Sequence, residues 1–200
     1  MKPSMLPPFH EIFDFVKPKT ICEIGTHDGK SAVQFIDYCV TINPKLKYYG
    51  YDVFDAVAND EAFHQREING KGAGNYRRAK RSLLHRQAKY KQFEFKLYKG
   101  FTQDTLKETN YDFVYIDGGH SYETVKYDYS KVKDSKVIVF DDYQTEGVKQ
   151  FFDELVMKEN LQQLDFKDCF SSKSKCWAFM PHSSTKHIQP VIFQNDFRTT

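Results

Sequence analysis

The sequence lacks the features that would place it in a membrane or at a structural zinc. No apolar run approaches the roughly 20 residues that a membrane-spanning helix needs. None of the four cysteines forms a CxxC pair, which disfavours a zinc site. The N-terminal stretch MKPSMLPPFHEIF has early prolines and no long apolar core, so it is not typical of a signal peptide. We therefore expect a cytoplasmic protein with reduced thiols and no membrane association.

A large excess of charge of one sign is also missing. The net charge is +2 over 200 residues, so the chain as a whole is not a polycation. The charge is unevenly placed, however, because the stretch from Lys71 to Lys91 holds eight Lys or Arg and no acid. The length suits one domain with a sizeable core. We therefore expect residues 1–200 to form a single domain with a locally basic segment.

What the sequence does contain is a set of short apolar runs that each end in glycine or aspartate. The clearest are TICEIGTHDGKS, YYGYDVFD, FVYIDGGHS and KVIVFDDY. Continuous apolar runs are typical of buried parallel strands. Segments with helical periodicity lie between them, at residues 30–40, 122–132 and 146–157. The pattern predicts an α/β fold with a Rossmann-like, mainly parallel seven-stranded sheet and helices on both faces.

Three segments depart from this alternation. The stretch between the strand ending at Asp52 and the strand beginning at Phe93 is about forty residues long, which exceeds a usual crossover. It contains a glycine-rich patch and a basic amphipathic helix, so we expect residues 55–91 to form a basic insert or lid. Residues 161–180 predict an antiparallel C-terminal edge hairpin around the turn SSKSK. Residues 181–200 form a mixed C-terminal tail.

Glycines and an acid follow the first two predicted strands. In open α/β sheets, ligands bind beyond the carboxyl ends of the strands. Gly25 and Gly29 let the backbone turn sharply and approach a ligand closely. They are four residues apart and do not form GxGxxG, which disfavours a pyrophosphate-binding loop. Asp52 can accept hydrogen bonds from two ribose hydroxyls, and a solvated acid at a strand end is the plainer alternative.

The next two strand ends carry an aromatic ring and a histidine. In LYKGFTQD, Phe101 could cover a purine face while Thr102 or Gln103 bonds its edge, although a plain surface loop also explains the segment. In YIDGGHSYE, the glycines leave space into which Asp117 and His120 point. This is typical either of a metal-ligating aspartate beside a histidine base or of a capped turn.

Two adjacent carboxylates follow the strand KVIVF. Asp141 and Asp142 repel one another unless water or a cation neutralises them. With Asp117 they could converge if their strands are neighbours, and carboxylate oxygens suit Mg²⁺ or Ca²⁺. The plainer alternative for Asp142 is a helix N-cap.

Together these strand ends resemble the class I S-adenosylmethionine-dependent methyltransferases, from about Thr20 to Tyr143. The pattern is similar to the metal-dependent O-methyltransferases of the catechol type. It also resembles a small bacterial group with the signature I-D-G-x-H-S-Y and the macrocin-type sugar O-methyltransferases. The basic insert and the tail lie outside the resemblance.

The resemblance implies an S-adenosylmethionine site along the first three strand ends. The family's first loop, E-x-G-x-x-x-G-x-S, holds the methionine part of the cofactor and corresponds here to residues 23–31. The ribose-binding acid corresponds to Asp52, and the adenine-binding segment G-x-S-Q-D corresponds to residues 100–104. The implied cofactor-binding residues are Glu23, Gly25, Thr26, His27, Gly29, Ser31, Asp52, Phe101, Thr102, Gln103 and Asp117.

The resemblance also implies a catalytic metal. The family's ligands correspond to Asp117, Asp141 and Asp142, which would hold Mg²⁺, with Asp142 standing where the family has asparagine. The family's base is a lysine, and His120 occupies that position. Histidine can accept a proton near neutral pH. His120 and Asp117 are therefore the implied catalytic residues, and the implied reaction is methylation of a hydroxyl on a sugar, a glycan precursor or a phenol.

Other functions stay open at this stage. The basic helix could contact nucleic-acid phosphates, but the sequence lacks the (D/N)PP(Y/F) motif of amino-methylating nucleic-acid enzymes, so we do not expect a nucleic-acid partner. A non-catalytic binding module of the same fold is a second alternative, and NAD-dependent oxidoreduction is a weaker third. The basic segment suggests an acidic or phosphorylated small-molecule acceptor, although a solvated helix face explains it equally well, and a homodimer is compatible with the sequence.

Overall fold

The computed structural model describes residues 6–159, other than 58, 69, 71 and 108, together with residues 177–179. Strands and helices alternate along the first part of the chain, as predicted. In chain order the elements are α1 (Leu6–Val16), β1 (Thr20–Ile24), α2 (Lys30–Ile42), β2 (Lys47–Asp52), the 3₁₀ helix η1 (Phe54–Val57), α3 (Glu61–Ile68), α4 (Tyr76–Lys89), β3 (Glu94–Lys99), α5 (Thr102–Thr105), β4 (Phe113–Ile116), α6 (Tyr122–Val132), β5 (Val137–Phe140), α7 (Glu146–Glu159) and β6 (Trp177–Phe179).

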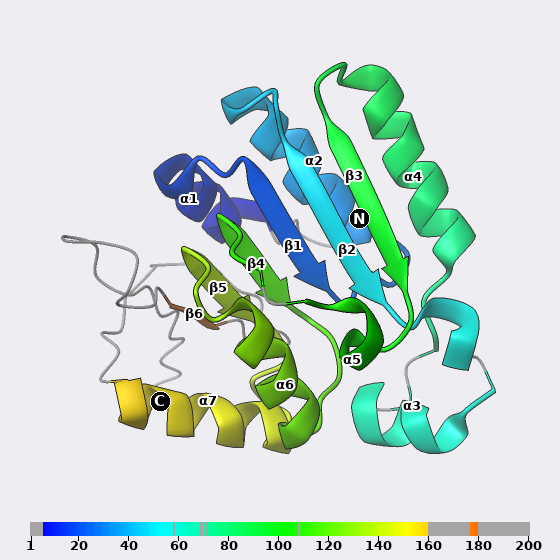
Figure 1. Ribbon diagram of the computed structural model, residues 1–200, viewed down its shortest axis with the longest axis vertical. Helices are drawn as coiled ribbons and strands as arrows, with labels where there is room; N and C mark the ends of the chain where they lie inside the picture. The colour runs from blue at the N-terminus through cyan, green and yellow to red at the C-terminus, as the bar shows by residue number, and fades with distance from the viewer. Residues whose placement is uncertain are drawn as a thin grey trace, which may run out of the picture.

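The described strands form one sheet in the order β3-β2-β1-β4-β5-β6 (Figure 1). Strands β1 to β5 are parallel, and β6 pairs with β5 in the antiparallel sense. The predicted α/β fold, with a mainly parallel sheet and an antiparallel C-terminal edge strand, is confirmed. The sheet has six strands in the described part of the chain, where we expected seven. The other half of the predicted hairpin, and the tail, lie outside the described residues.

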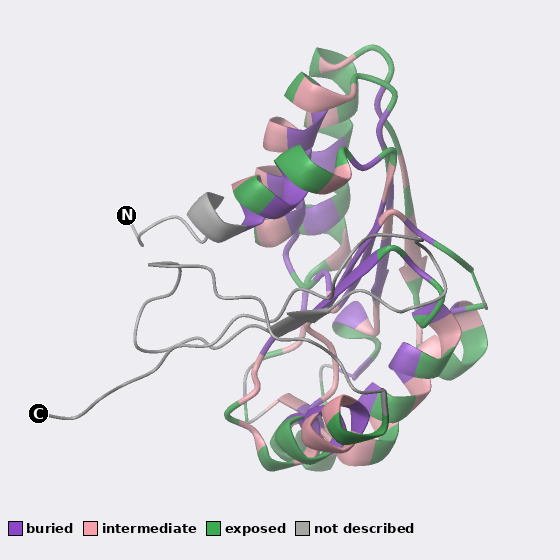
Figure 2. Cartoon of the chain, turned by 90° about the vertical axis from the view of Figure 1, so that its left-hand side faces the viewer, coloured by how far each residue is buried: buried purple, intermediate pink, exposed green. Residues whose placement is uncertain are grey.

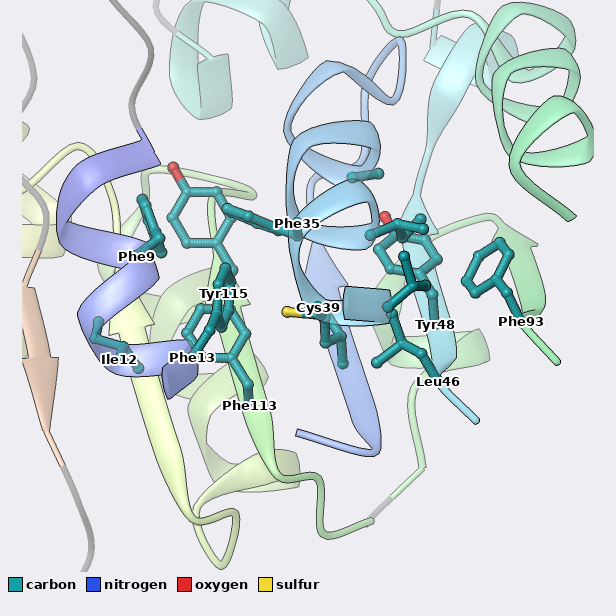
Figure 3. Packing of buried hydrophobic residues seen from close by; sticks show 14 of the residues in the cluster. Phe9, Ile12, Phe13, Phe35, Cys39, Leu46, Tyr48, Phe93, Phe113 and Tyr115 are labelled. Carbon is teal, nitrogen blue, oxygen red and sulfur yellow. The ribbon is translucent and has the colours of Figure 1, made fainter. Parts of the chain in front are cut away.

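Helices cover both faces of the sheet, and apolar side chains fill the two layers between them. Helices α1, α2 and α4 pack on one face, and α6 and α7 pack on the other. Figure 2 shows the buried residues gathered on the strands and on the inward sides of these helices. On the first face, the rings of Phe9 and Phe35 each meet the ring of Tyr115 edge to face (Figure 3), with 5.5 Å between the centroids of Phe9 and Tyr115. Much of the aromatic content therefore serves the core.

The long segment between β2 and β3 divides into two parts with different roles. Helix α4 is the crossover between two parallel strands, with Leu83 buried in the core and Arg86 Nη2 3.0 Å from Asp37 of α2. The short helices η1 and α3 lie instead at the carboxyl ends of the strands (Figure 1). The sequence pattern did not predict them. Helix α3 therefore lies over the strand ends, while the basic helix packs along the sheet, and a lid role for the insert stays a prediction.

No helix in the described part of the chain is both long enough and apolar enough to cross a membrane.

Strands β1 and β4 end side by side, and the backbones that follow them approach each other very closely. Gly25 has φ of +95°, and a Cβ atom at this position would lie 1.8 Å from the carbonyl oxygen of Asp117. A side chain is therefore excluded twice, by the backbone conformation and by the contact.

Replacing Gly25 with alanine should lower the free energy of unfolding by about 3 kcal/mol or more, because the loop must move away from β4. Urea denaturation measures this loss. Gly72→Ala is the matched control, since an added Cβ meets nothing within 4 Å there. Its midpoint should stay close to that of the wild type, and equal losses for the two variants would contradict the argument.

Candidate functional site

The predicted site residues meet at the carboxyl edge of the sheet. Asp52 ends β2, Asp117 follows β4, and Asp141 and Asp142 follow β5. Backbone hydrogen bonds keep the three central strand ends level, because Asp117 N donates to Ile24 O at 2.8 Å and Asp141 N donates to Ile116 O at 2.9 Å. Strands β4 and β5 are neighbours, as the convergence of their carboxylates requires.

Asp52 ties the loop after β1 to the start of η1. Its Oδ2 accepts a hydrogen bond from the backbone N–H of His27 at 2.7 Å, and its Oδ1 accepts one from the N–H of Phe54. Burial raises the pKa of Asp52, and these two N–H groups oppose the rise. A carboxylate can accept further hydrogen bonds on the same oxygens, so Asp52 keeps the capacity to bind ribose hydroxyls.

Glu23 supports the first loop from beneath. It is fully buried, and its two oxygens accept hydrogen bonds from the hydroxyls of Ser31 and Tyr48. The hydroxyls of Tyr48 and buried Thr26 are 3.2 Å apart. Burial raises the pKa of Glu23 to about 7, against the opposing effect of the two hydroxyl donors. In this structure Glu23 and Thr26 bond within the protein and stabilise the loop that carries Gly25 and His27.

The predicted adenine side lies beside helix α3. Phe101 precedes α5 and is 44% exposed, so its ring is available to a ligand. The ring of Phe63, from α3, lies 5.8 Å away at an interplanar angle of 72°. Helix α3 therefore contacts the strand end where we expect the purine.

His120 and Asp142 form a pair at the ends of β4 and β5. Nε2 of His120 lies 2.8 Å from Oδ2 of Asp142, and the histidine is only 7% exposed. Asp142 has φ of +53°, which turns the chain just after β5. With the carboxylate ionised, Nε2 is the protonated nitrogen and Nδ1 carries the lone pair. Nδ1 is shielded from solvent and has no hydrogen-bond partner among the described residues. The geometry is that of a base oriented by a carboxylate.

The two glycines between Asp117 and His120 do not leave open space, contrary to our expectation. A Cβ atom on Gly118 would lie 3.0 Å from Cγ2 of Ile24. A Cβ atom on Gly119 would lie 2.6 Å from Oε2 of Glu67 and 2.6 Å from Cγ2 of Thr124. The glycines allow other parts of the chain to pack directly on this loop.

Two buried acids near this loop were missed by the sequence prediction. Glu67 of α3 is 4% exposed, and Asp128 of α6 is 1% exposed. Burial raises the pKa of Asp128 to about 7, a hydrogen bond from Thr102 opposes the rise, and the charge of Glu67 adds to it. Asp128 lies in the apolar stripe of α6, between Val125 and Val132, so helical periodicity could have revealed it. No comparable signal marks Glu67.

The three aspartates predicted as metal ligands do not form a metal site in this arrangement. Among the residues that the structure describes, no group of three or more His, Cys, Asp or Glu is placed to hold a metal ion. The hydroxyl of Tyr115 and the N–H of Asp142, at 2.7 Å, both donate to Asp141. Asp142 pairs with His120. The divalent metal therefore stays a prediction that the geometry does not support.

Part of the positive charge of α4 is used inside the fold. Arg78 pairs with buried Asp28 in the first loop, and Arg86 pairs with Asp37 of α2. The side chain of Asn75 caps the helix by accepting from the N–H of Arg78 at 2.9 Å. These contacts attach α4 to α2 and the first loop, so the basic stretch is partly structural.

The strand order and the parallel pairing of β1 to β5 give a Rossmann-like α/β fold, with the polar residues described above at one edge of the sheet. The family is then given by comparison, because a family model described as a methyltransferase domain matches residues 22–143. This is more than half of the chain, and the protein belongs to that family of S-adenosylmethionine-dependent methyltransferases.

Comparison with individual proteins finds one curated relative and solved structures of similar fold. An uncharacterized protein of Sinorhizobium fredii (strain NBRC 101917 / NGR234), y4gI, is 28% identical over 150 residues, which cover 70% of this chain and 15% of that protein. The chain thus spans about 15% of the length of that curated relative. An O-methyltransferase from Bacillus cereus, solved in complex with S-adenosylhomocysteine, has a TM-score of 0.51 and 18% identity over 80% of this chain and 71% of its own. The calicheamicin methyltransferase CalS11 has a TM-score of 0.54 and 14% identity over 76% and 70%. At these identities the likeness shows the fold.

Replacing Glu23 with glutamine should flatten the dependence of stability on pH. The folded protein keeps the Glu23 proton up to about pH 7, whereas the unfolded chain loses it near 4.5. The stability that this group contributes is therefore complete below the unfolded pKa and falls as the pH rises to about 7, by roughly 3 kcal/mol. Urea midpoints between pH 4 and 8 measure the change.

The exposed Glu11 provides the control, because Glu11→Gln should leave the pH curve of the wild type unaltered. Some dependence should remain in Glu23→Gln, since the pKa of Asp128 is also raised to about 7. A curve for Glu23→Gln as steep as that of the wild type would show that Glu23 is not the titrating group.

Proposed function

We propose that this protein transfers a methyl group from S-adenosylmethionine to a hydroxyl of a small molecule, such as a sugar, a glycan precursor or a phenol. The family match and the fold shared with O-methyltransferases support this reaction. The observation that carries the choice of a hydroxyl is the pair of His120 Nε2 and Asp142 Oδ2, 2.8 Å apart, at the strand ends beside the predicted cofactor site.

The first three strand ends fit the cofactor in their chemistry. S-adenosylmethionine, when bound, supplies an electrophilic methyl carbon on a positively charged sulfur. Gly29 begins α2 in the left-handed conformation without a side-chain cap, so the first-turn N–H groups can face the methionine part. Asp52 would accept the ribose hydroxyls, and the exposed ring of Phe101 would cover the adenine.

The fourth and fifth strand ends provide the acid–base chemistry. Nδ1 of His120 would accept the proton of the acceptor hydroxyl once acceptor binding moves aside the groups that shield this atom from solvent, while Asp142 holds the Nε2–H and stabilises the resulting imidazolium. S-adenosylmethionine, if bound here, would supply the methyl carbon to the hydroxyl oxygen, and the electrons of the broken carbon–sulfur bond would remain on sulfur. The proton then leaves His120 for water. Holding the two reactants in line is the main contribution of the fold.

His120→Gln should remove the base while keeping the size and polarity of the side chain. We expect turnover to fall by roughly 10²- to 10⁴-fold, the usual contribution of a general base. Release of S-adenosylhomocysteine measures it, with a panel of catechol, a free hexose and a nucleotide-sugar as probe acceptors. Binding of S-adenosylhomocysteine, measured by calorimetry, should stay within about threefold of the wild type because the first three strand ends are intact.

The control is His85→Gln, since His85 is an exposed histidine on α4, away from the strand ends. It should keep full turnover. Full turnover in His120→Gln would overturn the assignment of the base, and absence of S-adenosylhomocysteine binding in the wild type would overturn the proposed reaction itself.

Removal of divalent ions should leave the methyl transfer largely intact. The geometry supports His120 as the proton acceptor and does not bring Asp117, Asp141 and Asp142 together as ligands. Turnover with and without EDTA tests this. Activity that EDTA abolishes and Mg²⁺ restores, together with loss of that activity in Asp141→Ala, would instead support the metal predicted from the sequence.

A further inference from the structure

We propose that Glu67 of α3 is a positioning residue, which holds the loop that carries His120 in its working conformation. The proposal rests on the proposed function, since His120 is the group to be positioned. Glu67 lies 53 residues before His120 in the chain, in a helix that the sequence pattern did not predict. Three kinds of observation support its role: its hydrogen bonds, its burial and charge, and the space that Gly119 leaves for it.

Glu67 binds two consecutive backbone groups of the loop after β4. Its carbonyl oxygen accepts the N–H of His120 at 2.8 Å. Its side-chain Oε2 accepts the N–H of Ser121 at 3.2 Å. Two neighbouring peptide units held by one residue fix both the position and the rotation of the chain at His120.

The carboxylate of Glu67 also lies where its charge is favourable. Ser121 is the N-cap of α6, so Glu67 meets the positive end of the helix dipole. Its other oxygen accepts a hydrogen bond from Nε of Arg66 at 2.8 Å, which compensates a charge that is almost fully buried. Burial raises the pKa of Glu67, but hydrogen bonds from Arg66, Ser121 and Thr124 outweigh it and hold the pKa below its usual range.

Gly119 is required for this contact. A Cβ atom at residue 119 would lie 2.6 Å from Oε2 of Glu67, so any larger residue would displace the carboxylate. The second glycine of IDGGH thus serves the approach of Glu67 from a distant part of the chain. The contact therefore joins Gly119 of the IDGGH motif to Glu67 of α3.

His120 is held from opposite directions. Asp142, after β5, binds its ring through Nε2, while Glu67, in α3, binds its backbone. The start of α7 closes the third side, because a Cβ atom on Gly147 would lie 2.4 Å from the carbonyl oxygen of His120. Loss of the Glu67 side chain would leave its backbone carbonyl on the N–H of His120 but remove the bond to the N–H of Ser121, so that one of the two peptide units next to the histidine would be released. The ring would remain on Asp142 with a loosened backbone.

The experiment compares Glu67→Ala, Glu67→Gln and a control on the same helix, Glu61→Ala, in the full-length protein. Glu61 is exposed in the first turn of α3. Hydrogen–deuterium exchange of residues 119–122 reports on the loop without any acceptor. Calorimetry with S-adenosylhomocysteine reports on the cofactor side, and kcat and KM with the best acceptor of the probe panel report on turnover.

For Glu67→Ala we expect exchange at residues 119–122 to be about tenfold faster. We expect kcat to fall by roughly 10- to 100-fold through misplacement of His120, with KM and S-adenosylhomocysteine binding within about threefold. Glu67→Gln keeps an amide oxygen for the N–H of Ser121, so it should restore most of kcat and of the protection. If Glu67→Ala only destabilised the protein, Glu67→Gln would not restore kcat. The loss would also not be confined to kcat while KM stays unchanged.

Unchanged exchange and unchanged kcat in Glu67→Ala, or equal losses in Glu67→Ala and Glu61→Ala, would overturn the positioning role. Failure of the proposed function has a different signature. If His120→Gln kept full turnover, the base would be wrong, while the exchange rates of Glu67→Ala would still show whether Glu67 holds the loop.

Discussion

The contact between Gly25 and the backbone of Asp117 is the constraint on which the rest of the site depends. At this point β1 and β4 end side by side, and the order in which the chain adds strands to the sheet reverses. Strands β2 and β3 lie on one side of this point, and β5 and β6 lie on the other. No side chain separates the two strand ends; the loop after β1 bonds to Asp52 through the N–H of His27, and the loop after β4 carries His120, which pairs with Asp142. One half of the edge thereby suits a nucleoside and the other half suits a proton acceptor.

Acidic side chains bind the loops on both halves of this edge of the sheet, and these side chains differ in their solvent exposure. Glu23, Glu67 and Asp128 are buried behind the edge, where hydrogen bonds hold the pKa of Glu67 below its usual range, while burial prevails at Glu23 and Asp128 and raises each pKa to about 7. Asp52 and Asp142 stand at the edge and bind a loop amide and a histidine. The buried acids fix the loops, and the edge acids face the chemistry. This division explains why so many carboxylates can gather in one small region of a protein with little net charge.

The strands, α2, α6 and α7 could be predicted because each carries a simple pattern, a continuous apolar run or a stripe of buried residues, that is set by neighbours close in sequence. Helix α3 could not, because EAFHQREI has no apolar stripe and is stabilised by distant groups such as Ser121 and Phe101. The sequence also could not show which basic residues of α4 have partners inside the fold: Arg78 and Arg86 pair with acids in the first loop and on α2, and an acidic acceptor stays a prediction.

The parallel α/β fold, the family resemblance and the set of polar residues at the strand ends could be predicted from the amino-acid sequence, because they follow from local periodicity and from residues adjacent to each strand. How those polar residues are divided among partners depends on the folded arrangement. This arrangement turned Asp141 toward Tyr115 and Asp142 toward His120, it buried Glu23 beneath the loop it was expected to line, and it brought Glu67 against Gly119. Such choices depend on hydrogen bonds between segments far apart in the chain, which no local pattern of residues encodes.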